Sequence, residues 1–525
     1  MIETKDKHAE LIETLIEIGV ALSAEKNHEK LLKLILGSAM ELTNADGGTL
    51  YLVEHELELR FAIIANKTLK IMPSSAEEAK LPVTSLSLYV DGKPNLKNVA
   101  CYCYHKNQSV NIDDAYHEKG FDFTGMKNTD AKLGYRSKSF LTIPLRDHEN
   151  TRIGILQLIN AIDEETGEVI PFSEERKLLA ESLASQAAIT ITKERLIQAQ
   201  KKLFEAFLQL IAKAIDEKSH YTSNHCKRVP VLTNMIADAM NKVSDGPLKD
   251  MHFTDEQREE LNVAAWLHDC GKIVTPEYVM DKATKLEALT DRIEVVNSRF
   301  EIVKRDMKIA HLEKLLKNPG LKDQLESEYK KQLDFINEAQ GYINKANTGG
   351  EFLSDDDKKK IHDIGTIHVF HDGREERPLL SEDEIANLSI ARGTLNDKER
   401  QTIQNHVKIT YSMLSSLPYP DYLKNVPVIA GSHHERMDGK GYPNRINKDT
   451  LCVQARIVAI ADVFEALTSA DRPYKKAKTL KEVLGLMTEM KNAGHIDPDI
   501  YDLFINEKIY LEYAKKYLKL EQMDE

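Results

Sequence analysis

The feature that most limits how this chain can fold is a long run without glycine or proline. It reads SEERKLLAESLASQAAITI and, one residue later, KERLIQAQKKLFEAFLQLIAKAIDEKS. We expect one continuous helix that ends an N-terminal domain and continues, as residues 193–215, into a C-terminal domain. Such a helix is a stiff connection that can pass on a rotation or a shift, whereas a Gly/Ser linker would uncouple the two domains.

Two helical segments carry apolar residues on one face. In residues 1–26 the spacing is that of an amphipathic helix; the apolar positions are Leu11, Leu15, Ile18 and Leu22. The connecting segment has a longer set: Leu196, Ile197, Leu203, Phe207, Leu210, Ile211 and Ile215. Both faces suit pairing with a second copy of the chain, and we expect no partner for the first one within its own domain. For the connecting segment, packing onto the chain's own domains is the alternative. We predict a homodimer formed through the N-terminal domain and the connecting helices.

Residues 27–192 combine helices and strands. A helical pattern (LLKLILGSAMELTNA) precedes two strands (GGTLYLVEHE and LELRFAIIAN), and two more strands (KSFLTIPLRD and RIGILQLINA) follow a long polar middle. An antiparallel sheet with flanking helices is expected, an α+β domain of the ligand-binding type. Within the polar middle, Cys101 and Cys103 could form a disulfide, but in a reducing compartment we expect two thiols in a partly buried strand.

This N-terminal region resembles the GAF domains, and NIDDAYHEKGFDF, DAKLGYRSKSFLTIPL and GILQLINA resemble the cyclic-nucleotide-binding ones most. The family's nucleotide signature is only partly kept, because Ala161 follows Asn160 and acidic residues follow Phe172 and Ser173. The GAF ligand is therefore left open. Three polar residues that could bind a ligand could equally cap a turn; they are Asn111, Asp113 and Asp114.

Composition narrows the function classes. The chain has 525 residues, 42% hydrophobic and 30% charged, with a formal net charge of −13. Two or three domains are expected, and the acidic balance argues against broad nucleic-acid binding, so no DNA partner is predicted. The sequence shows neither a run of about 18 apolar residues nor the apolar core of a signal peptide at its start. We expect a cytoplasmic protein without a membrane partner.

The C-terminal half is organised around AAWLHDCGKIVT. There an apolar helical pattern ends in His268 and Asp269, followed by Gly271 and Lys272. An imidazole, a carboxylate and an ammonium at one helix end suit a metal bound next to a phosphate. Adjacent helical residues do not face each other, so the pair can meet at one metal only where the helix ends or bends, which the glycine permits.

A second His-Asp pair, His362-Asp363, has the same letters. It follows the solvated run DDDKKK, whereas the first pair ends an apolar helix, so the first is predicted to be the functional one. A separate metal site made by His362, His368 and His371 is the alternative to ordinary surface residues.

Further imidazoles and carboxylates lie in separate segments. They are His225 in HCKRV, His406 in QTIQNHVKI, His433 and His434 in SHHERMDGKGYP, and Asp462 in ARIVAIADVFEAL. Ligands of these types without a thiolate favour iron, manganese, nickel or zinc, and a carboxylate can bridge two such ions. His406 could instead be a packed core residue, while Asp462 on an apolar helix requires a cation. A site at the centre of a helical bundle is expected.

These motifs resemble the HD-GYP phosphodiesterases over most of Asp216 to Phe504. HDCGK, HHERMDGKGYP and ARIVAIADVFEALTSADRPY carry the resemblance, which implies an all-α domain at residues 216–510 and a tail at 511–525. The implied metal ligands are His225, His268, Asp269, His406, His433, His434 and Asp462. Some members bind a third ion through a Glu one turn before the first His. Tyr221 stands there, which predicts two ions, with Glu217 as the alternative ligand. Iron or manganese is expected, and nickel or zinc remains open.

The chain departs from the family pattern at residues 285–391. The first half of this insertion predicts two long charged helices joined at NPG, a helical hairpin. The second half, IHDIGTIHVFHDGREERPLL, predicts a small lobe that contains strands.

The ligand set suggests metal-assisted phosphodiester hydrolysis. Two ions bridged by Asp269 would lower the pKa of a water from ~15.7 towards neutrality and supply hydroxide for attack on phosphorus. Lys272 would hold a phosphate oxygen. By resemblance Arg472 and Lys475 would grip the substrate phosphates, with a surface ion pair to Asp471 or Glu465 as the alternative for these cations. The GKGYP turn, with Glu435, Asp438 and Gly439 before it, is expected to be structural or to face a partner.

By resemblance the substrate is cyclic di-GMP, opened to the linear dinucleotide pGpG, with further cleavage to GMP left open. Three alternatives stay open: hydrolysis of another cyclic dinucleotide such as 3′,3′-cyclic GMP-AMP, a receptor that binds the dinucleotide without turnover, and a scaffold that recruits protein partners through the GYP loop or the insertion.

Overall fold

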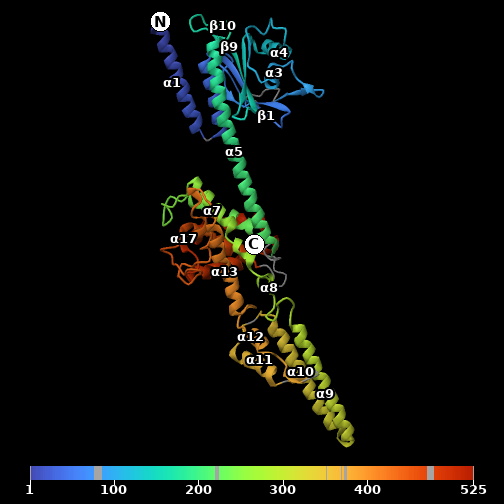
Figure 1. The fold of residues 1–525 in the computed structure, drawn as a ribbon. Coiled ribbons are helices and arrows are strands. Elements are labelled where there is room, and N and C mark those ends of the chain that lie inside the picture. The colour runs from blue at the N-terminus through green and yellow to red at the C-terminus, as the bar shows by residue number, and fades with distance from the viewer. Residues whose placement is uncertain are drawn as a thin grey trace. The chain divides into compact units, whose positions relative to one another are not determined.

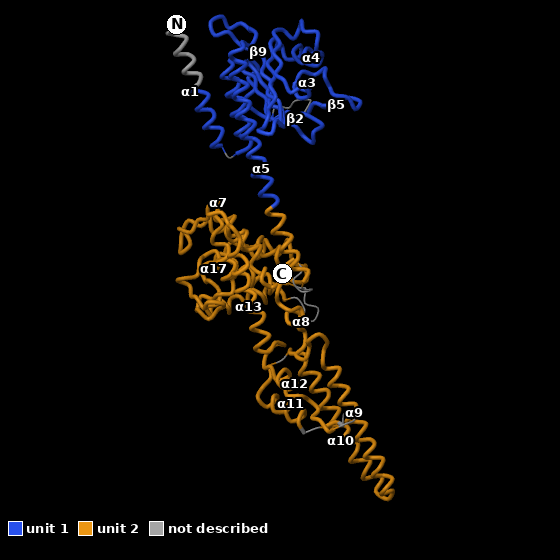
Figure 2. The backbone as a smooth tube through the Cα atoms, in the orientation of Figure 1, with its two compact units in different colours: residues 1–203 blue, residues 204–525 orange. Residues whose placement is uncertain are grey.

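A computed structural model describes residues 2–25, 27–75, 78, 85–218, 224–350, 352–367, 369–371, 375–469 and 478–523. For residues 2–12, 367 and 371 it describes the backbone alone. The chain forms two compact units, unit 1 at residues 1–203 and unit 2 at residues 204–525 (Figure 2). The division falls within the single helix α5 (Glu174–Lys218), which matches the uninterrupted helical run in the sequence.

Unit 1 is built on an antiparallel sheet with the strand order β3-β2-β1-β9-β8-β7. Strand β10 extends it beside β9, β4 pairs with β2, and β5 and β6 form a separate hairpin. The strands are β1 (Ala45–Glu54), β2 (Glu58–Asn66), β3 (Ile71–Ser74), β4 (Ser85–Ser87), β5 (Tyr89–Val90), β6 (Lys93–Pro94), β7 (Val110–Ile112), β8 (Phe140–Arg146), β9 (Arg152–Ile162) and β10 (Val169–Ile170).

Helices cover both faces of this sheet (Figure 1). One face packs on α1 (Ile2–Ala24), α2 (His28–Leu42) and the first part of α5, and the other on α3 (Val99–Lys106), with α4 (Thr124–Leu133) beside β7. The alternation of strand side chains produces the two cores: Leu50 and Leu52 face α2, whereas Tyr51 faces α3. The predicted α+β fold is confirmed.

Two expectations for unit 1 were wrong. Cys101 and Cys103 are free, buried thiols, but they lie on α3 and not in a strand. Asn98 caps that helix by accepting the backbone N–H of Cys101 at 3.2 Å. An asparagine at this position is a helix-start signal, which the prediction of a strand overlooked. The stripe on α1 also has a partner within its own unit, because Leu22 is buried in the core and Leu15 packs against it.

Two of the polar residues considered as ligand contacts in unit 1, Asn111 and Asp114, make hydrogen bonds within the fold. Asp114 accepts the backbone N–H of Tyr116 at 2.9 Å and so caps a turn, while Asp113 is exposed. The side chain of Asn111 donates to the carbonyl of Phe172 at 2.9 Å. Asn160 accepts the backbone N–H of Lys138 at 2.7 Å and thereby joins the end of β9 to the start of β8.

Outside residues 285–391, unit 2 is a helical bundle around one apolar core. Its helices are α6 (His225–Met240), α7 (Asp255–Leu267), η1 (Cys270–Val274), α8 (Glu277–Met280), α13 (Asp397–Ser415), η3 (Asp421–Leu423), α14 (Val426–Ala430), α15 (Val453–Thr468), α16 (Leu480–Asn492), α17 (Pro498–Asn506), α18 (Ile509–Tyr517) and η4 (Leu520–Gln522). The helices α6, α7 and α15, which carry or end at candidate ligands, contribute to this core together with α17 and α18.

Residues 511–525 are not a tail as far as the structure describes them. Tyr513 on α18 is 1% exposed and packs edge-on against Phe464 of α15. Gln522 is buried and donates to the carbonyl of Thr468 at 2.8 Å, at the end of α15. The C-terminal segment therefore closes the bundle beside the helix that carries Asp462.

The segment predicted as an insertion has its own apolar core. Two long helices form a hairpin through η2, and a helix, a two-stranded ribbon and another helix follow. The elements are α9 (Ile293–Lys317), η2 (Pro319–Leu321), α10 (Lys322–Asn347), α11 (Asp355–Ile367), β11 (Val369–His371), β12 (Glu376–Pro378) and α12 (Glu382–Leu388). The HDIG letters, predicted to belong to a strand-containing lobe, lie on α11. Across the described residues, every helix is too short or too polar to span a bilayer.

Candidate metal centre

The His268-Asp269 pair lies where α7 ends. His268 is the C-terminal cap of α7, and Asp269 leaves the helical conformation with φ of −103° and ψ of 9°. Both side chains are buried, at 0% and 2% exposure. Gly271 follows because the chain passes against α13 there: a Cβ atom would lie 2.0 Å from the carbonyl oxygen of His406. The helix end that the sequence required is present.

Three side chains from three segments converge on one side of Asp269. His225 begins α6, His268 ends α7 and Asp462 lies on α15. The Nε2 atom of His225 lies 3.2 Å from Oδ1 of Asp462 and 3.3 Å from Nε2 of His268. These three residues offer ligand atoms within 4.8 Å of one another, so they could hold one metal ion.

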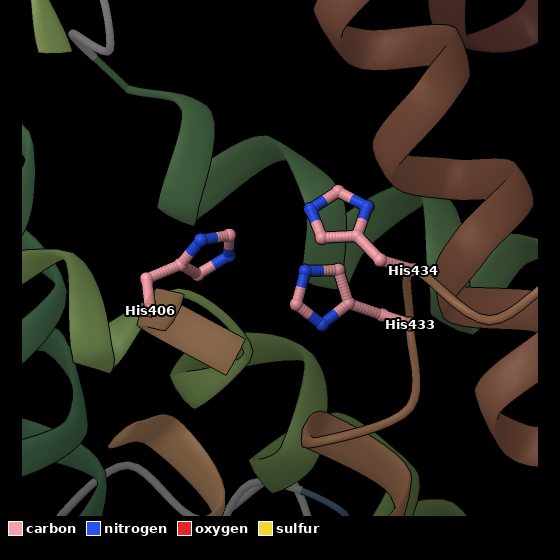
Figure 3. A group of neighbouring side chains, drawn as sticks. All are labelled: His406, His433 and His434. Carbon is pink, nitrogen blue, oxygen red and sulfur yellow. The ribbon is translucent and has the colours of Figure 1, made fainter. Parts of the chain in front are cut away.

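A second group of three lies on the other side. His406 comes from α13, and His433 and His434 follow the end of α14. Figure 3 shows the ring of His406 facing the two adjacent imidazoles across a small gap. The ligand atoms of this group also lie within 4.8 Å of one another. The ring of His434 stacks at 32° on Tyr442, whose centroid is 4.8 Å away.

Asp269 connects the two groups through its two oxygens. Oδ2 lies 3.2 Å from Nε2 of His268 and 3.4 Å from Nε2 of His225. Oδ1 lies 3.2 Å from Nε2 of His406 and 4.0 Å from Nε2 of His433. A carboxylate placed in this way can be shared by two ions.

The hydrogen bonding of the cluster favours a bound cation. Nδ1 of His406 and Nδ1 of His433 each donate to a backbone carbonyl at 2.6 Å, so in the neutral ring Nε2 carries the lone pair. Both Nε2 atoms and Oδ1 of Asp269 are buried and have no hydrogen-bond partner in the described part of the chain. Lone pairs that face one another in a buried site require a positive ion between them, and the residues therefore fit divalent metal binding.

Charges are strongly coupled in this cluster. Burial opposes the charged form of Asp269, but Lys272 and His268 outweigh it and hold the pKa of Asp269 well below its usual value. Burial would likewise lower the pKa of His225, yet Asp269, Asp462 and Glu465 raise it well above the usual value. Burial lowers the pKa of His434 to about 4, which keeps this ring neutral and able to bind a metal.

The structure brings all seven predicted ligands together, but not all the predicted substrate contacts can be located. Nζ of Lys272 lies 2.5 Å from Oδ2 of Asp269, so in this structure the lysine pairs with the carboxylate. Arg472, Lys475 and Tyr221 lie outside the described residues. Glu217, the alternative third-ion ligand, is described and exposed near the end of α5.

Sequence reasoning missed the residues that support the ligands. Glu465 and Arg228 follow Asp462 and His225 by three residues, and the Glu465 carboxylate contacts both Nδ1 of His225 and Nε of Arg228. The Oγ1 atom of Thr410 on α13 accepts the backbone N–H of Gly271 at 2.9 Å. His225 and Arg228 are three residues apart on one helix, and Asp462 and Glu465 are three residues apart on another, so each pair lies on one helix face. This shared spacing was the signal in the sequence that the two faces could pack together.

The GYP turn is structural in the part that the structure describes. Glu435 is buried and accepts the backbone N–H groups of Asn444 and Ile446, at 2.6 and 3.1 Å. Gly439 has φ of +71°, and Asp438 receives the backbone N–H of Lys440 at 3.0 Å. The Tyr442-Pro443 bond is cis. This turn fixes the chain after His434 and places Tyr442 on that ring.

The second His-Asp pair has none of these surroundings. His362 and Asp363 lie within α11, and their side chains are 61% and 48% exposed. His368 and the side chain of His371 lie outside what the structure describes. Within the described residues, no group of metal-binding side chains includes His362.

Comparison with known protein families agrees with this architecture. Residues 27–191 match the model of the GAF domain, and residues 382–500 match a model of the HD domain. The chain carries a GAF domain and an HD domain. The HD match includes His406, His433, His434 and Asp462, whereas His225, His268 and Asp269 precede it.

Several characterised proteins are similar to part of this GAF–HD chain. The 3′3′-cGAMP-specific phosphodiesterase 1 of Vibrio cholerae is 34% identical over 148 residues, 28% of this chain and 29% of that protein. The 3′3′-cGAMP-specific phosphodiesterase 3 of the same organism is 37% identical over 110 residues, 21% and 23% of the two chains. A cyclic di-GMP phosphodiesterase response regulator of Xanthomonas campestris is 37% identical over 120 residues, 23% and 31%. The matches thus span less than a third of each relative.

Proposed function

We propose that this protein is a metal-dependent phosphodiesterase of the HD-GYP type that hydrolyses cyclic di-GMP to linear pGpG. The observation that carries the proposal is Asp269, whose two oxygens face two adjoining groups of three potential ligands, with His268 and His433 also within reach of each other. Two ions held side by side are suited to in-line displacement at phosphorus. The relatives named above, which act on cyclic dinucleotides by their names, support the substrate class.

Each residue of the cluster has a defined task in this proposal. His225, His268 and Asp462 hold one ion. His406, His433 and His434 hold the other, and Asp269 is shared. When bound, such ions, iron or manganese by the ligand types, lower the pKa of water towards neutrality and neutralise charge on the phosphate. The carbonyls of Ala265 and Ala430 fix the orientation of His268 and His433 through their Nδ1 atoms, 2.8 and 2.6 Å away.

Lys272 supplies positive charge beside the shared carboxylate. Burial would lower its pKa, but Asp269 and Asp462 raise it, so the side chain carries a full charge at neutral pH. Its side chain is 21% exposed and can meet a phosphate oxygen without leaving the cluster. Arg472 and Lys475 are proposed as further phosphate contacts from the sequence motif.

A second substrate has specific support. Two of the relatives described above are named as specific for 3′3′-cGAMP, at 34% and 37% identity. The alternative function is therefore hydrolysis of 3′,3′-cyclic GMP-AMP at the same centre. Both reactions break a phosphodiester linkage between two nucleotides, so the metal centre serves either.

The test is a product assay. Anaerobically prepared full-length protein is loaded with iron or manganese, incubated with each cyclic dinucleotide, and followed by chromatography. Linear product is expected from the wild type and not from Asp269→Ala, while the faster of the two substrates identifies the natural class. Tight binding of either dinucleotide without turnover under both metals would replace the enzyme by a receptor.

We also propose that the GAF domain regulates the HD domain and that the chain is a homodimer. Ile189, Leu196 and Leu203 on α5 are spaced by seven residues and are 53, 61 and 58% exposed, the pattern of a two-helix seam. Leu196→Glu should give a monomer in sedimentation. Leu289→Glu, at an 89% exposed position outside α5, is the matched control and should stay dimeric. A monomeric wild type would contradict the dimer.

A further inference from the structure

The imidazoles of the centre are anchored in two different ways. His268, His406 and His433 each direct Nδ1 to the backbone carbonyl three residues earlier, at 2.8, 2.6 and 2.6 Å. His225 instead directs Nδ1 to a carboxylate oxygen of Glu465. A carboxylate partner makes an imidazole a stronger metal ligand than a neutral carbonyl does, and it also fixes the ring.

Glu465 is itself held in place. Its side chain is 1% exposed, and its second oxygen lies 2.6 Å from Nε of Arg228. Arg228 lies one helical turn after His225 on α6, and Glu465 lies one turn after Asp462 on α15. Each helix therefore carries a candidate ligand and, one turn later, a charged residue that takes part in the contact between the helices. The guanidinium compensates the buried charge of Glu465 and holds the carboxylate from the side opposite His225.

The two groups consequently differ in charge. The His225–His268–Asp462 group contains an anionic ligand of its own and the anion Glu465 behind it, although Arg228 offsets part of that charge. The His406–His433–His434 group consists of imidazoles alone, and Asp269 is common to both groups. A divalent cation is attracted more strongly to the first group.

We propose that Glu465, fixed by Arg228, makes the His225–His268–Asp462 site the tighter of the two metal sites, and that the His406–His433–His434 site exchanges its ion. Glu465 is thus a positioning residue, acting through His225. The inference rests on the two-ion centre of the proposed function, but it concerns metal affinity and not turnover.

Metal counting tests this order directly. Metal-free full-length protein is titrated anaerobically with Mn²⁺, and bound metal is measured by equilibrium dialysis and mass spectrometry. The wild type should bind two ions in two resolved steps. Glu465→Gln should weaken the first step by ~10–100-fold, the usual effect of removing an outer partner of a metal ligand. Arg228→Met should weaken it in the same direction.

A matched control separates this effect from the general loss of a buried charge. Glu260 on α7 is 2% exposed and accepts the backbone N–H of Asn425 at 2.7 Å, within the same bundle. Glu260→Gln should leave both binding steps unchanged. An unchanged first step in Glu465→Gln, or an equal loss in Glu260→Gln, overturns the proposal.

Two further variants retain Glu465, so the order of the sites remains testable if Glu465→Gln does not fold. His406→Ala should remove the weaker step and keep the tighter one, whereas Asp462→Asn should remove the tighter step. The reverse pattern, or a wild type that binds only one ion, overturns the inference. Two ordered steps in a protein that hydrolyses neither dinucleotide would support the inference while refuting the proposed function; turnover with an unchanged first step in Glu465→Gln would do the opposite.

Discussion

The letters His-Asp-x-Gly occur twice in unit 2, and the two copies have opposite surroundings. His268 and Asp269 end α7 and are buried, whereas His362 and Asp363 lie inside α11 and are 61% and 48% exposed. Within a helix, adjacent side chains point about 100° apart, so two neighbours can meet one ion only where the helix stops. The position of the motif in its helix therefore matters more than its letters.

The largest expected difference between the two copies is in catalysis. Asp269→Ala removes the carboxylate shared by both groups and should lower the rate of hydrolysis by more than ~100-fold. Losing a residue that only supports a metal ligand costs up to ~100-fold, and losing the shared ligand itself should cost more. Asp363→Ala, its matched control, should stay within about twofold of the wild type because exposed substitutions cost under ~0.5 kcal/mol. Chromatographic rates for both variants measure this. A comparable loss in Asp363→Ala would mean that the second pair takes part in function.

The two glycines sharpen the same comparison. A Cβ at Gly271 would lie 2.0 Å from the carbonyl oxygen of His406 and 2.7 Å from the backbone nitrogen of Thr410, so α13 must move. A Cβ at Gly365 would meet side-chain atoms of Leu380, the nearest at 2.9 Å. Gly271→Ala should lower the free energy of unfolding by ~1–3 kcal/mol, typical of overpacking, and displace His406 from the cluster.

Gly365→Ala should cost less than Gly271→Ala. A side chain can yield more easily than backbone, and alanine within a helix recovers ~0.5–1 kcal/mol over glycine. Thermal unfolding of both variants and their Mn²⁺ content provide the two readings. Equal destabilisation with unchanged metal content in Gly271→Ala would show that the close approach to α13 is not needed by the centre.

The sequence predicted which candidate ligands would lie together but not the residues that support them. His225 and Asp462 could be recognised because their residue types and local motifs are distinctive. Glu465 could not be assigned to His225, because 240 residues separate them and only the packing of α6 on α15 brings them together. Long segments such as α5 and the α9–α10 hairpin were predictable because their apolar pattern repeats over many turns. Short segments carry too few repeats for such a pattern to be recognised.

Short elements depend on tertiary contacts. The residues 511–525 carry too brief a pattern to reveal that Tyr513 fills the core. Cys101 and Cys103 are two residues apart, a spacing that puts two side chains on one face of a strand, and only the cap at Asn98 indicates a helix. In each case the local pattern was compatible with two structures, and burial against distant residues selected one.

Each of the two regions that contain the motif has a lysine that is at least partly buried, and the two lysines have different partners. The ammonium of Lys272 pairs with Asp269, whereas Nζ of Lys285, on a side chain only 1% exposed, donates to the carbonyl of Leu388 at 2.9 Å. Burial lowers the pKa of Lys285 to about 8. Burial disfavours the charged form of Lys285 in the folded chain, and this lowers the free energy of unfolding. The loss of stability is full below the folded pKa of ~8 and disappears as the pH rises towards the unfolded pKa of ~10.5.

Lys285→Met should therefore stabilise the apolar core of α9, α10 and α12 at pH 7, on the order of 1–2 kcal/mol. The gain should shrink as the pH approaches 9.5, because the wild type then loses the unfavourable charge. Hydrogen exchange of the α10 and α12 amides, measured at both pH values, reports on this region without requiring two-state unfolding. Protection that is independent of pH in the wild type would contradict a neutralised lysine.

The smallest expected effect concerns two helix caps. Asn396 accepts the backbone N–H of Glu399 at 3.0 Å and starts α13, which carries His406. Ser381 accepts that of Glu384 at 3.2 Å and starts α12, which packs in the separate apolar core of α9 and α10. Asn396→Ala and Ser381→Ala should each cost ~1 kcal/mol of local stability. Only Asn396→Ala should also weaken Mn²⁺ binding, by a few-fold, because fraying of α13 loosens the helix that holds His406. Equal metal affinity in the two variants would mean that the packing of α13 on Gly271 fixes this ligand without help from its cap.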